Sequence, residues 1–389
     1  MTPAILALNL GSSSVKSALF EATTLAVIER GSITGIGGHP RAEFRDSKGA
    51  PIAAPEFPRG LGLEEAVGWL LGHLRERMPE VRLAAVGHRV VHGGTRFDKP
   101  IRITADVLTE LDALSPLAPN HQPFALAAIR SVSTQLPEVP QIACFDTAFH
   151  RSQSRLAQWF ALPRALSESG VIRYGFHGIS YEYIASVLPD IAGEAANGRV
   201  IVAHLGHGAS LCAMRNLRSV ATSMGFTPLD GLMMGTRCGS LDPGVVLYLL
   251  RERGMSPAQV EELLGKRSGL LGVSGLSDDV HTLEANDDPR AREALDMFAD
   301  RTAAEIAAHC TALGGLDALV FTAGIGEHSA RMRAEICKRL NWIGVTLDEA
   351  ANFRHAQDVS ATNSSVKIFV VPTDEEAVIA RAARRLVSP

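Results

Sequence analysis

Cysteine is scarce in this chain, and long apolar runs are absent. The chain has 389 residues and five cysteines, none of them in a CxxC pair, as expected where thiols stay reduced. No stretch reaches the roughly 18 uninterrupted apolar residues that a membrane span needs. The apolar N-terminal stretch has no basic residue before Lys16 and no small-residue cleavage pattern, which argues against a signal peptide. We therefore expect a cytoplasmic protein that is neither disulfide-stapled nor membrane-spanning.

Charge of one sign does not accumulate either. Lysine and arginine number 38 and aspartate and glutamate 42, a formal net charge of −4, with no run of like charges. Nucleic acid is therefore not expected as the main partner. Hydrophobic residues make up 46% of the chain and charged residues 21%, which is typical of a folded, soluble protein. The length predicts two or three domains.

Two similar hairpins lie about half a chain apart. Residues 4–8 form an apolar run that enters the turn 9–14 and leaves as a second apolar run over 15–20. Residues 200–203 lead in the same way into the turn 205–210 and out over 211–214. The pair suggests an internal duplication with one copy in each half.

Apolar patterning elsewhere predicts both strands and helices, and hence an α/β architecture. Strands are expected over 84–92, 141–145, 316–321 and 366–371. Helices are expected over 63–78, 123–135, 243–253, 257–264, 291–313, 329–340 and 375–386. The run 316–321 should reach its helix through a glycine turn at Gly324-Ile325-Gly326. Residues 35–62 are expected to form a loop or an irregular hairpin.

The glycine and serine turns predict phosphate binding. Clustered backbone N–H groups form an anion site, and small residues let phosphate oxygens come close. The chain has no GxxxxGK[ST] motif, so it is not a P-loop protein, and Gly324-Ile325-Gly326 lacks the third glycine of the dinucleotide fingerprint. Ordinary hairpin turns remain the alternative.

Two arginines lie close to glycines. Arg89 precedes Gly93-Gly94, and Arg237 lies between Gly235 and Gly239. An accessible guanidinium can hold a carboxylate or a phosphate through two parallel hydrogen bonds, although a structural arginine is the alternative for each one. His121 and His177 also lie in loop-like surroundings, and they count only as members of a set.

Two acidic residues complete the candidates. Asp146 follows the strand 141–145, and Glu375 lies where a strand leads into the last helix. Ligands of open α/β folds bind at the carboxyl ends of strands, so these acids could meet a metal. Glu375 could equally stabilise the helix dipole. Because DxD and HExxH are absent, magnesium carried by a nucleotide fits better than a metal held by protein alone.

Taken together, these segments resemble the acetokinase family, within the actin-like, sugar-kinase-like and chaperone-ATPase superfamily. The resemblance runs from the turn 9–14 to 372–376, and its most specific pieces are 222–229, 234–237 and 321–327. It implies a duplicated ribonuclease-H-like (actin-like ATPase) fold of two domains with a central cleft. An acyl and phosphate-side domain would span 1–146 with the returning helix 377–389, and a nucleotide-binding domain 147–376.

The resemblance also implies roles for individual residues. The implied catalytic residues are Arg89, His121, Asp146, His177 and Arg237. The implied acyl-substrate residues are Arg89, Val91, Asn120, Phe176 and Pro228. The implied nucleotide-binding residues are Ser12, Ser14, Lys16, His204, Gly206, His207, Gly208, Asp279, Val280, His281, Gly324, Ile325, Gly326 and His328. The implied magnesium ligands are Asn9, Asp146 and Glu375.

The sequence departs from the family pattern at several of these positions. His207 stands in the family's LGNG motif, His328 ends its GIGEN motif, and His281 replaces an arginine near the base. Asn120 replaces a leucine of the acyl pocket. Ile179 and Tyr181 alter the GTSH stretch that follows His177.

The function implied by the resemblance is Mg²⁺-dependent phosphoryl transfer from ATP to acetate, giving acetyl phosphate and ADP, by a homodimer. A kinase for propionate or another short acid is the alternative within the enzyme class. A non-catalytic nucleotide-binding regulator of the same superfamily is the alternative from a different class. The pair Arg89 and Arg237 favours an enzyme, because a protein that only binds nucleotide does not need both.

Overall fold

A computed structural model describes residues 2–11, 13–119 and 121–387 of the chain. The chain forms two compact units. Unit 1 contains the chain up to Phe149 and the segment from Asp374 onward, and unit 2 contains His150–Thr373. The chain therefore leaves unit 1, builds unit 2 and then returns. The assignment of an acyl side to one unit and a nucleotide side to the other stays a prediction.

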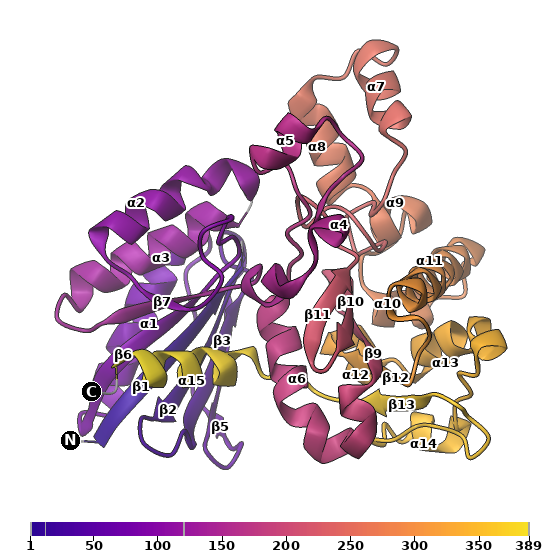
Figure 1. The fold of residues 1–389 in the computed structure, drawn as a ribbon. Coiled ribbons are helices and arrows are strands. Elements are labelled where there is room, and N and C mark those ends of the chain that lie inside the picture. Colours follow the sequence, from indigo (N-terminus) through magenta and orange to yellow (C-terminus); the bar gives the residue numbers. More distant parts are fainter. Residues whose placement is uncertain (1, 12, 120, 388–389) are drawn as a thin grey trace. The chain divides into compact units, whose positions relative to one another are not determined.

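An eight-stranded sheet forms the centre of unit 1 (Figure 1), in the order β5-β4-β3-β2-β1-β6-β8-β7. Its strands are β1 (Thr2–Leu10), β2 (Ser14–Glu21), β3 (Val27–Thr34), β4 (Arg41–Asp46), β5 (Pro51–Ile52), β6 (Val81–Val90), β7 (Ile101–Arg102) and β8 (Gln141–Phe145). Strands β1 to β5 pair antiparallel in succession, whereas β1, β6 and β8 run parallel. The residues of β8 are all buried, as expected of a parallel strand covered on both faces.

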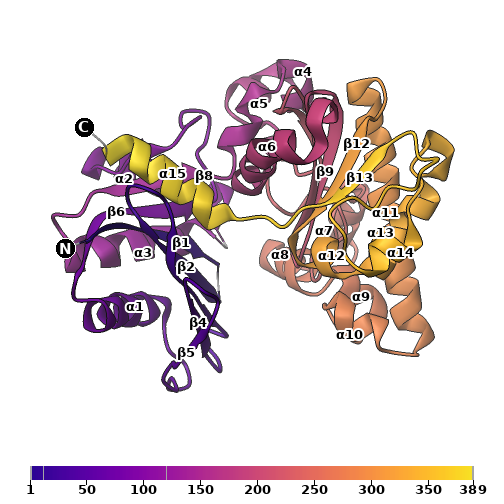
Figure 2. The ribbon, with the colours of Figure 1, turned by 90° about the horizontal axis from the view of Figure 1, so that it is seen from below.

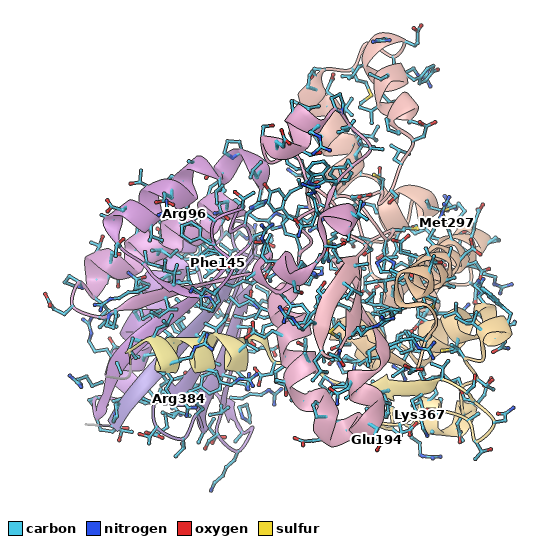
Figure 3. All side chains as sticks on the ribbon, in the orientation of Figure 1. Arg96, Phe145, Glu194, Met297, Lys367 and Arg384 are labelled. Carbon is cyan, nitrogen blue, oxygen red and sulfur yellow. The ribbon has the colours of Figure 1, made fainter. Side chains whose placement is uncertain are left out.

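Helices cover the sheet of unit 1. They are α1 (Leu63–Arg77), α2 (Ala105–Ala113), α3 (Gln122–Gln135) and α15 (Glu375–Val387). Helices α1 and α3 pack against each other and bury a core that includes Leu8, Leu70 and Val132. Phe145 at the end of β8, labelled in Figure 3, stacks on Phe97 with the ring centroids 5.2 Å apart. Helix α15 packs on β1 and β6.

A five-stranded sheet forms the centre of unit 2, in the order β11-β10-β9-β12-β13. Its strands are β9 (Arg199–Leu205), β10 (Ala209–Arg215), β11 (Arg218–Thr222), β12 (Ala318–Thr322) and β13 (Lys367–Val370). Its helices are α4 (Arg155–Gln158), α5 (Arg164–Glu168), α6 (Gly178–Ala192), α7 (Pro243–Arg251), α8 (Pro257–Lys266), α9 (Gly269–Ser274), α10 (Val280–Glu284), α11 (Pro289–Leu313), α12 (Ala323–His328), α13 (Ala330–Arg339) and α14 (Glu349–Phe353). In Figures 1 and 2, α6 and α11 lie on opposite sides of this sheet.

The two sheets share one strand pattern. In each, three strands pair antiparallel (β3-β2-β1 and β11-β10-β9), and two further strands continue parallel to the first (β6 and β8, β12 and β13). The two expected hairpins are β1-β2 and β9-β10, which occupy equivalent places in this pattern. The predicted internal duplication and ribonuclease-H-like fold are thus confirmed.

The glycine turn expected after the strand 316–321 is wrong in detail. Strand β12 leads directly into the short helix α12, which includes Gly324 and Gly326, and α13 follows. The helix can begin at once because Glu327 Oε1 accepts the N–H of Ala323, at 2.7 Å, and so satisfies one of the free donors of its first turn. The region 35–62 contains the small β4-β5 hairpin at the edge of the sheet. In the part of the chain that the structure describes, no helix has the length and apolarity to cross a membrane.

Candidate active site

Four predicted residues of unit 1 meet at the carboxyl ends of three neighbouring strands. Asn9 is near the end of β1, Arg89 is near the end of β6, and Asp146 directly follows β8. Glu375 begins α15, which packs on the same strands. The parallel arrangement brings these residues together although they are up to 366 positions apart in sequence.

Arg89 is the centre of this group. Its Nε donates to both oxygens of Asp146, at 2.9 and 3.1 Å, and its Nη2 donates to Asp146 Oδ2 at 2.6 Å. Its Nη1 donates to Asn9 Oδ1 at 3.0 Å and lies 3.6 Å from Glu375 Oε2. Asn9 Nδ2 in turn donates to Glu375 Oε2 at 2.7 Å. The Asp146 side chain is 1% exposed and that of Arg89 is 19% exposed, so the carboxylate is buried while part of the arginine side chain stays accessible.

The charges around Arg89 stabilise its protonated, positively charged form. Burial alone would lower the pKa of the Arg89 guanidinium, but the Asp146 and Glu375 carboxylates raise that pKa above its ordinary value. Glu376, which the sequence reasoning missed, also contacts the group, because Asn9 Nδ2 donates to its Oε1 at 3.2 Å. Burial and the neighbouring Glu375 raise the pKa of the Glu376 carboxyl.

The predicted magnesium ligands have a suitable donor set. Asp146, Glu375 and Asn9 offer carboxylate and amide oxygens, which magnesium prefers, and two carboxylates face the single charge of Arg89. Among the described residues, no group of three or more histidines, cysteines, aspartates and glutamates is arranged to hold a metal by itself. The residues therefore fit a magnesium ion that brings other ligands with it.

The remaining predicted residues of unit 1 are placed as follows. His121 precedes α3 as its N-cap residue and is half-buried, and Val91 is buried directly after β6. Ser14 and Lys16 lie on β2, with Lys16 exposed. Ser12 and Asn120 lie outside the described residues.

In unit 2, His177 is held in an unusual backbone conformation. It precedes α6 as its N-cap residue with φ 57° and ψ 22°, in the left-handed region that costs a non-glycine residue roughly 1–2 kcal/mol. Its Nδ1 lies 2.8 Å from Ser210 Oγ on β10. A β-carbon placed on Gly208 would lie 3.3 Å from His177 Nε2 and 3.8 Å from Arg237 Nη1. The structure thus brings His177 and Arg237 together over the β9-β10 turn.

Arg237 is positioned by its own loop. Its Nη1 donates to the carbonyl of Pro228, another predicted residue, at 3.0 Å. The first turn of α9 holds the loop, since Leu270 N donates to Met234 O and Leu271 N to Gly235 O. Gly269 has φ 63°, and a β-carbon there would lie 2.2 Å from Met234 O, so only glycine permits this approach.

His204, on β9 just before the β9-β10 turn, packs against His177. The two rings stack with centroids 4.2 Å apart, and His204 Nδ1 lies 2.9 Å from Ser180 Oγ. Ser180 Oγ also contacts Thr373 Oγ1 at 2.9 Å. His204 is 8% exposed, so little of it is available for the predicted contact with nucleotide.

Phe176, predicted to line the acyl pocket, is fully buried, and His150 contacts its backbone carbonyl. His150 Nε2 lies 2.9 Å from the carbonyl of Phe176, and His150 Nδ1 lies 2.9 Å from Ser219 Oγ. Burial lowers the pKa of His150 to about 4, so it is neutral and Nε2 can donate to that carbonyl as one tautomer. Sequence reasoning did not identify this support.

The other predicted nucleotide residues occupy three elements of unit 2. His207 lies in the β9-β10 turn with Gly206 and Gly208, where its Nε2 is 3.0 Å from Asp278 Oδ2 and its ring covers Gly235. Asp279 caps α10, on which Val280 is buried and His281 exposed. Gly324, Ile325, Gly326 and His328 are on α12.

Comparison with known proteins identifies the family. A model of the acetokinase family matches residues 4–381. The chain belongs to the acetokinase family. An acetate kinase of Rhodopseudomonas palustris (strain ATCC BAA-98 / CGA009) is 52% identical over 99% of each chain, and a propionate kinase of Citrobacter rodentium (strain ICC168) is 42% identical over 99% of this chain and 97% of its own.

Solved structures agree with this membership. The crystal structure of a propionate kinase from Francisella tularensis has a TM-score of 0.92 at 36% identity, covering 99% of this chain and all of that one. The crystal structure of Porphyromonas gingivalis acetate kinase has a TM-score of 0.86 at 35% identity with the same coverage.

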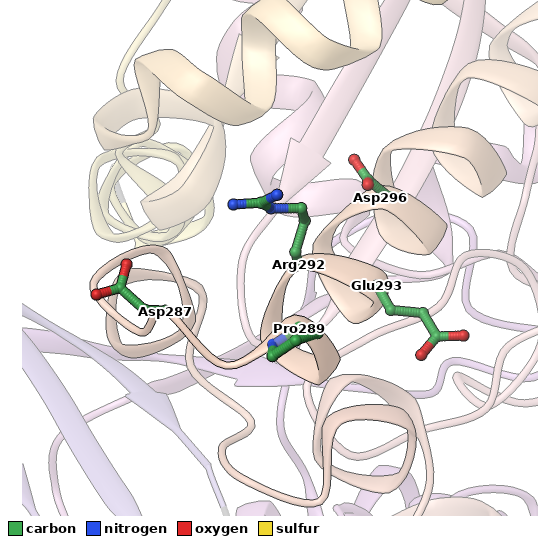
Figure 4. A pocket seen from close by; sticks show the side chains of 5 residues that line it. All are labelled: Asp287, Pro289, Arg292, Glu293 and Asp296. Carbon is green, nitrogen blue, oxygen red and sulfur yellow. The ribbon is translucent and has the colours of Figure 1, made fainter.

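One surface hollow of this acetokinase-family chain lies apart from the predicted residues. It has a volume of about 360 Å³ and is lined by Asp287, Pro289, Arg292, Glu293 and Asp296 at the start of α11 (Figure 4). Three of its five residues are acidic and none belongs to the predicted site. The hollow is therefore not a candidate for the phosphate or carboxylate site.

Proposed function

We propose that this chain is an acetate kinase, which transfers a phosphoryl group directly and reversibly between ATP and acetate to form ADP and acetyl phosphate. The observation that carries the proposal is the match to the acetokinase family over almost the whole chain, with acetate kinases of three bacteria 45–52% identical to it. The arginine and histidine groups of the two units supply the chemistry that such a reaction needs.

Acetate needs no base to become a nucleophile. A carboxylic acid with a pKa of about 4 is already ionised at neutral pH. What opposes the reaction is repulsion between the carboxylate and the phosphates, so catalysis depends on positioning and on charge neutralisation. The guanidinium of Arg89, which is partly buried and partly exposed, is suited to this task.

The proposed roles follow from the contacts in each unit. In unit 1, Asp146 orients Arg89 by hydrogen bonds to Nε and Nη2, and Arg89 binds the carboxylate. In unit 2, Arg237 and the Nε2 edge of His177 face the Gly208 turn and stabilise the charge of the transferring phosphoryl group. His121 of unit 1 is assigned a supporting catalytic role, as the family resemblance implies.

We propose Mg²⁺ as the metal. Asn9, Asp146 and Glu375 would hold it, and when bound it supplies charge neutralisation on the nucleotide phosphates. The cellular setting that we propose is the cytoplasm, supported by five cysteines that form no disulfide in the structure. The homodimer implied by the family resemblance is also part of the proposal.

Propionate is the second candidate substrate. It is favoured by the 0.92 TM-score to a protein described as a propionate kinase and by the 42% identity to another. Val91, Phe176 and Pro228 keep the apolar character of the expected acyl pocket, and one added methylene in such a pocket changes selectivity by only about 10–200-fold.

Trapping the product with hydroxylamine tests the proposal. The protein would be assayed with acetate, propionate and butyrate as acceptors, and with ATP, GTP and pyrophosphate as donors, because His207, His281 and His328 depart from the family pattern. We expect acetyl hydroxamate with ATP and Mg²⁺. Nucleotide binding without hydroxamate from any acid would contradict the proposal and support the non-catalytic alternative.

A substitution at Arg237 tests its role in turnover. Arg237→Leu should lower kcat by about 10³ or more while ATP affinity stays close to that of the wild type. Arg251→Leu, which removes an exposed arginine of α7 in the same unit, is the matched control and should leave kcat unchanged. Equal kcat values for the two variants would contradict the role assigned to Arg237.

A further inference from the structure

A line of hydrogen bonds connects His177 to a buried tyrosine on the next turn of α6. His177 Nδ1 lies 2.8 Å from Ser210 Oγ, and Ser210 Oγ lies 2.5 Å from the hydroxyl of Tyr181. Ser210 and Tyr181 are both 0% exposed. The backbone N–H of Tyr181 also donates to the carbonyl of His177, at 3.1 Å. Tyr181 is thus tied to His177 through both its backbone and its side chain.

The chemistry of the three groups determines which atom donates and which accepts in each hydrogen bond. Burial raises the pKa of the Tyr181 phenol well above its ordinary value, so the hydroxyl keeps its proton and can donate it. A serine hydroxyl has one proton to give and two lone pairs to accept with. When Tyr181 donates to Ser210 Oγ, the Ser210 proton is directed at His177 Nδ1. Nδ1 is then an acceptor, and the proton of a neutral imidazole resides on Nε2.

The position of Nε2 makes this tautomer relevant to the reaction. Nε2 is the ring atom that faces the Gly208 turn, on the same side as Arg237 Nη1. An N–H at Nε2 can donate to a phosphoryl oxygen placed over the turn, whereas the other tautomer would present a lone pair there and repel it. The contact with Ser210 and the stacking on His204 hold the ring of His177 in this direction.

We propose that Tyr181 is a positioning residue, which through Ser210 holds His177 as the tautomer whose Nε2 carries the proton and faces the β9-β10 turn. The inference rests on the proposed phosphoryl transfer. The assignment is carried by the contacts of Tyr181 with Ser210 and of Ser210 with His177, and by the burial of Tyr181 and Ser210.

Single and double variants test the hydrogen-bonded path from Tyr181 through Ser210 to His177, called the relay below, by its effect on the kinetics. Tyr181→Phe keeps the ring and removes the donor, and we expect kcat to fall about tenfold, with the KM for ATP and acetate nearly unchanged. Ser210→Ala should lower kcat by about 100-fold. Because both groups act through one path, the double variant should be no slower than Ser210→Ala alone. Tyr248→Phe, which alters an exposed tyrosine of α7, is the matched control and should behave like the wild type.

NMR of isotope-labelled histidine supplies a readout that does not depend on activity. The His177 signals would be assigned by their loss in His177→Ala. In the wild type we expect Nδ1 without a proton and Nε2 with one, and in Tyr181→Phe and Ser210→Ala a mixture of both tautomers.

The outcomes separate the relay from the proposed function. An unchanged tautomer in both variants, or kcat losses that multiply in the double variant, would overturn the relay. A wild-type protein that forms no hydroxamate would overturn the proposed function, and the NMR result would then decide the relay by itself. If Tyr181→Phe unfolds, the smaller change Ser210→Ala carries the same two readouts.

Discussion

Arg333 offers a prediction whose size can be worked out from its contacts. Its side chain is fully buried in unit 2 on α13. It donates to the carbonyls of Gly326 and Glu327 at 2.8 and 2.9 Å, and to the backbone and side-chain oxygens of Asn352 at 2.9 and 2.7 Å. Burial lowers its pKa to about 10, so it remains charged at neutral pH. One guanidinium therefore joins the end of α12 to α14.

Arg333→Met removes these donors and nearly preserves the apolar volume. The carbonyl of Gly326 and both oxygens of Asn352 then lose a buried donor, at about 1–2 kcal/mol each, or roughly 3–6 kcal/mol in total. At about 2–4 °C per kcal/mol for a unit of this size, the melting temperature of unit 2 should fall by roughly 6–24 °C. Because α12 carries Gly324 and Ile325 of the proposed nucleotide site, the KM for ATP should rise about tenfold, with the KM for acetate unchanged.

Calorimetry of the two units, with and without ATP, measures the loss of stability, and steady-state kinetics measures the two KM values. Arg331→Met is a close control, because Arg331 lies on the same helix two residues earlier and is exposed. Equal melting temperatures for the two variants would refute the reasoning, since the buried hydrogen bonds would then contribute nothing.

Two further predictions concern charge. Asp146→Asn should lower kcat by about 10² or more, because Arg89 loses the carboxylate that binds its guanidinium through two nitrogens. Asp98→Asn, at an exposed site of unit 1, is the control and should leave kcat unchanged. Equal kcat values for the two variants would count against the role of the Arg89–Asp146 pair. Burial lowers the pKa of His88 and of His150 to about 4 from 6.5, so both are neutral when folded, and the unfolded chain gains protons as the pH falls from 6.5 towards 4. Stability present above pH 6.5 should therefore fall across that window by up to about 1.4 kcal/mol per pH unit for each histidine, and urea unfolding of His88→Gln should show a weaker dependence on pH.

Much of the fold could be predicted from apolar patterning. Strand 141–145 was predicted with the bounds of β8, and the helices expected over 63–78 and 123–135 are α1 and α3 within a residue. Helix α6 was missed, although it is amphipathic, because His177 and Gly178 at its start read as a loop and Pro189 lies within it. Strand β3, which lies between β2 and β4, was also missed, since its residues are mostly half-buried and carry no long apolar run.

The candidate site was predicted as separate residues and not as a network. Arg89, Asp146, Asn9 and Glu375 were each singled out, but a sequence does not show that parallel strand ends bring them onto one guanidinium. Ser210 was placed in the turn expected to bind phosphate and Tyr181 was named only as a departure from the family pattern, so neither was identified as a partner of His177. The link between them spans 29 positions and depends on how α6 packs beside β10.

The return of the chain from unit 2 to α15 has a consequence for folding during synthesis. Strands β1 and β6 leave the ribosome early, yet the helix that covers them, with Ile379 seated against Gly87, is made only after all of unit 2. Unit 2 can complete its own sheet while the face of β1 and β6 that α15 covers is still exposed in unit 1. Glu375 arrives at Arg89 with that same helix, so the nascent enzyme closes its core and acquires its last site carboxylate in one late step.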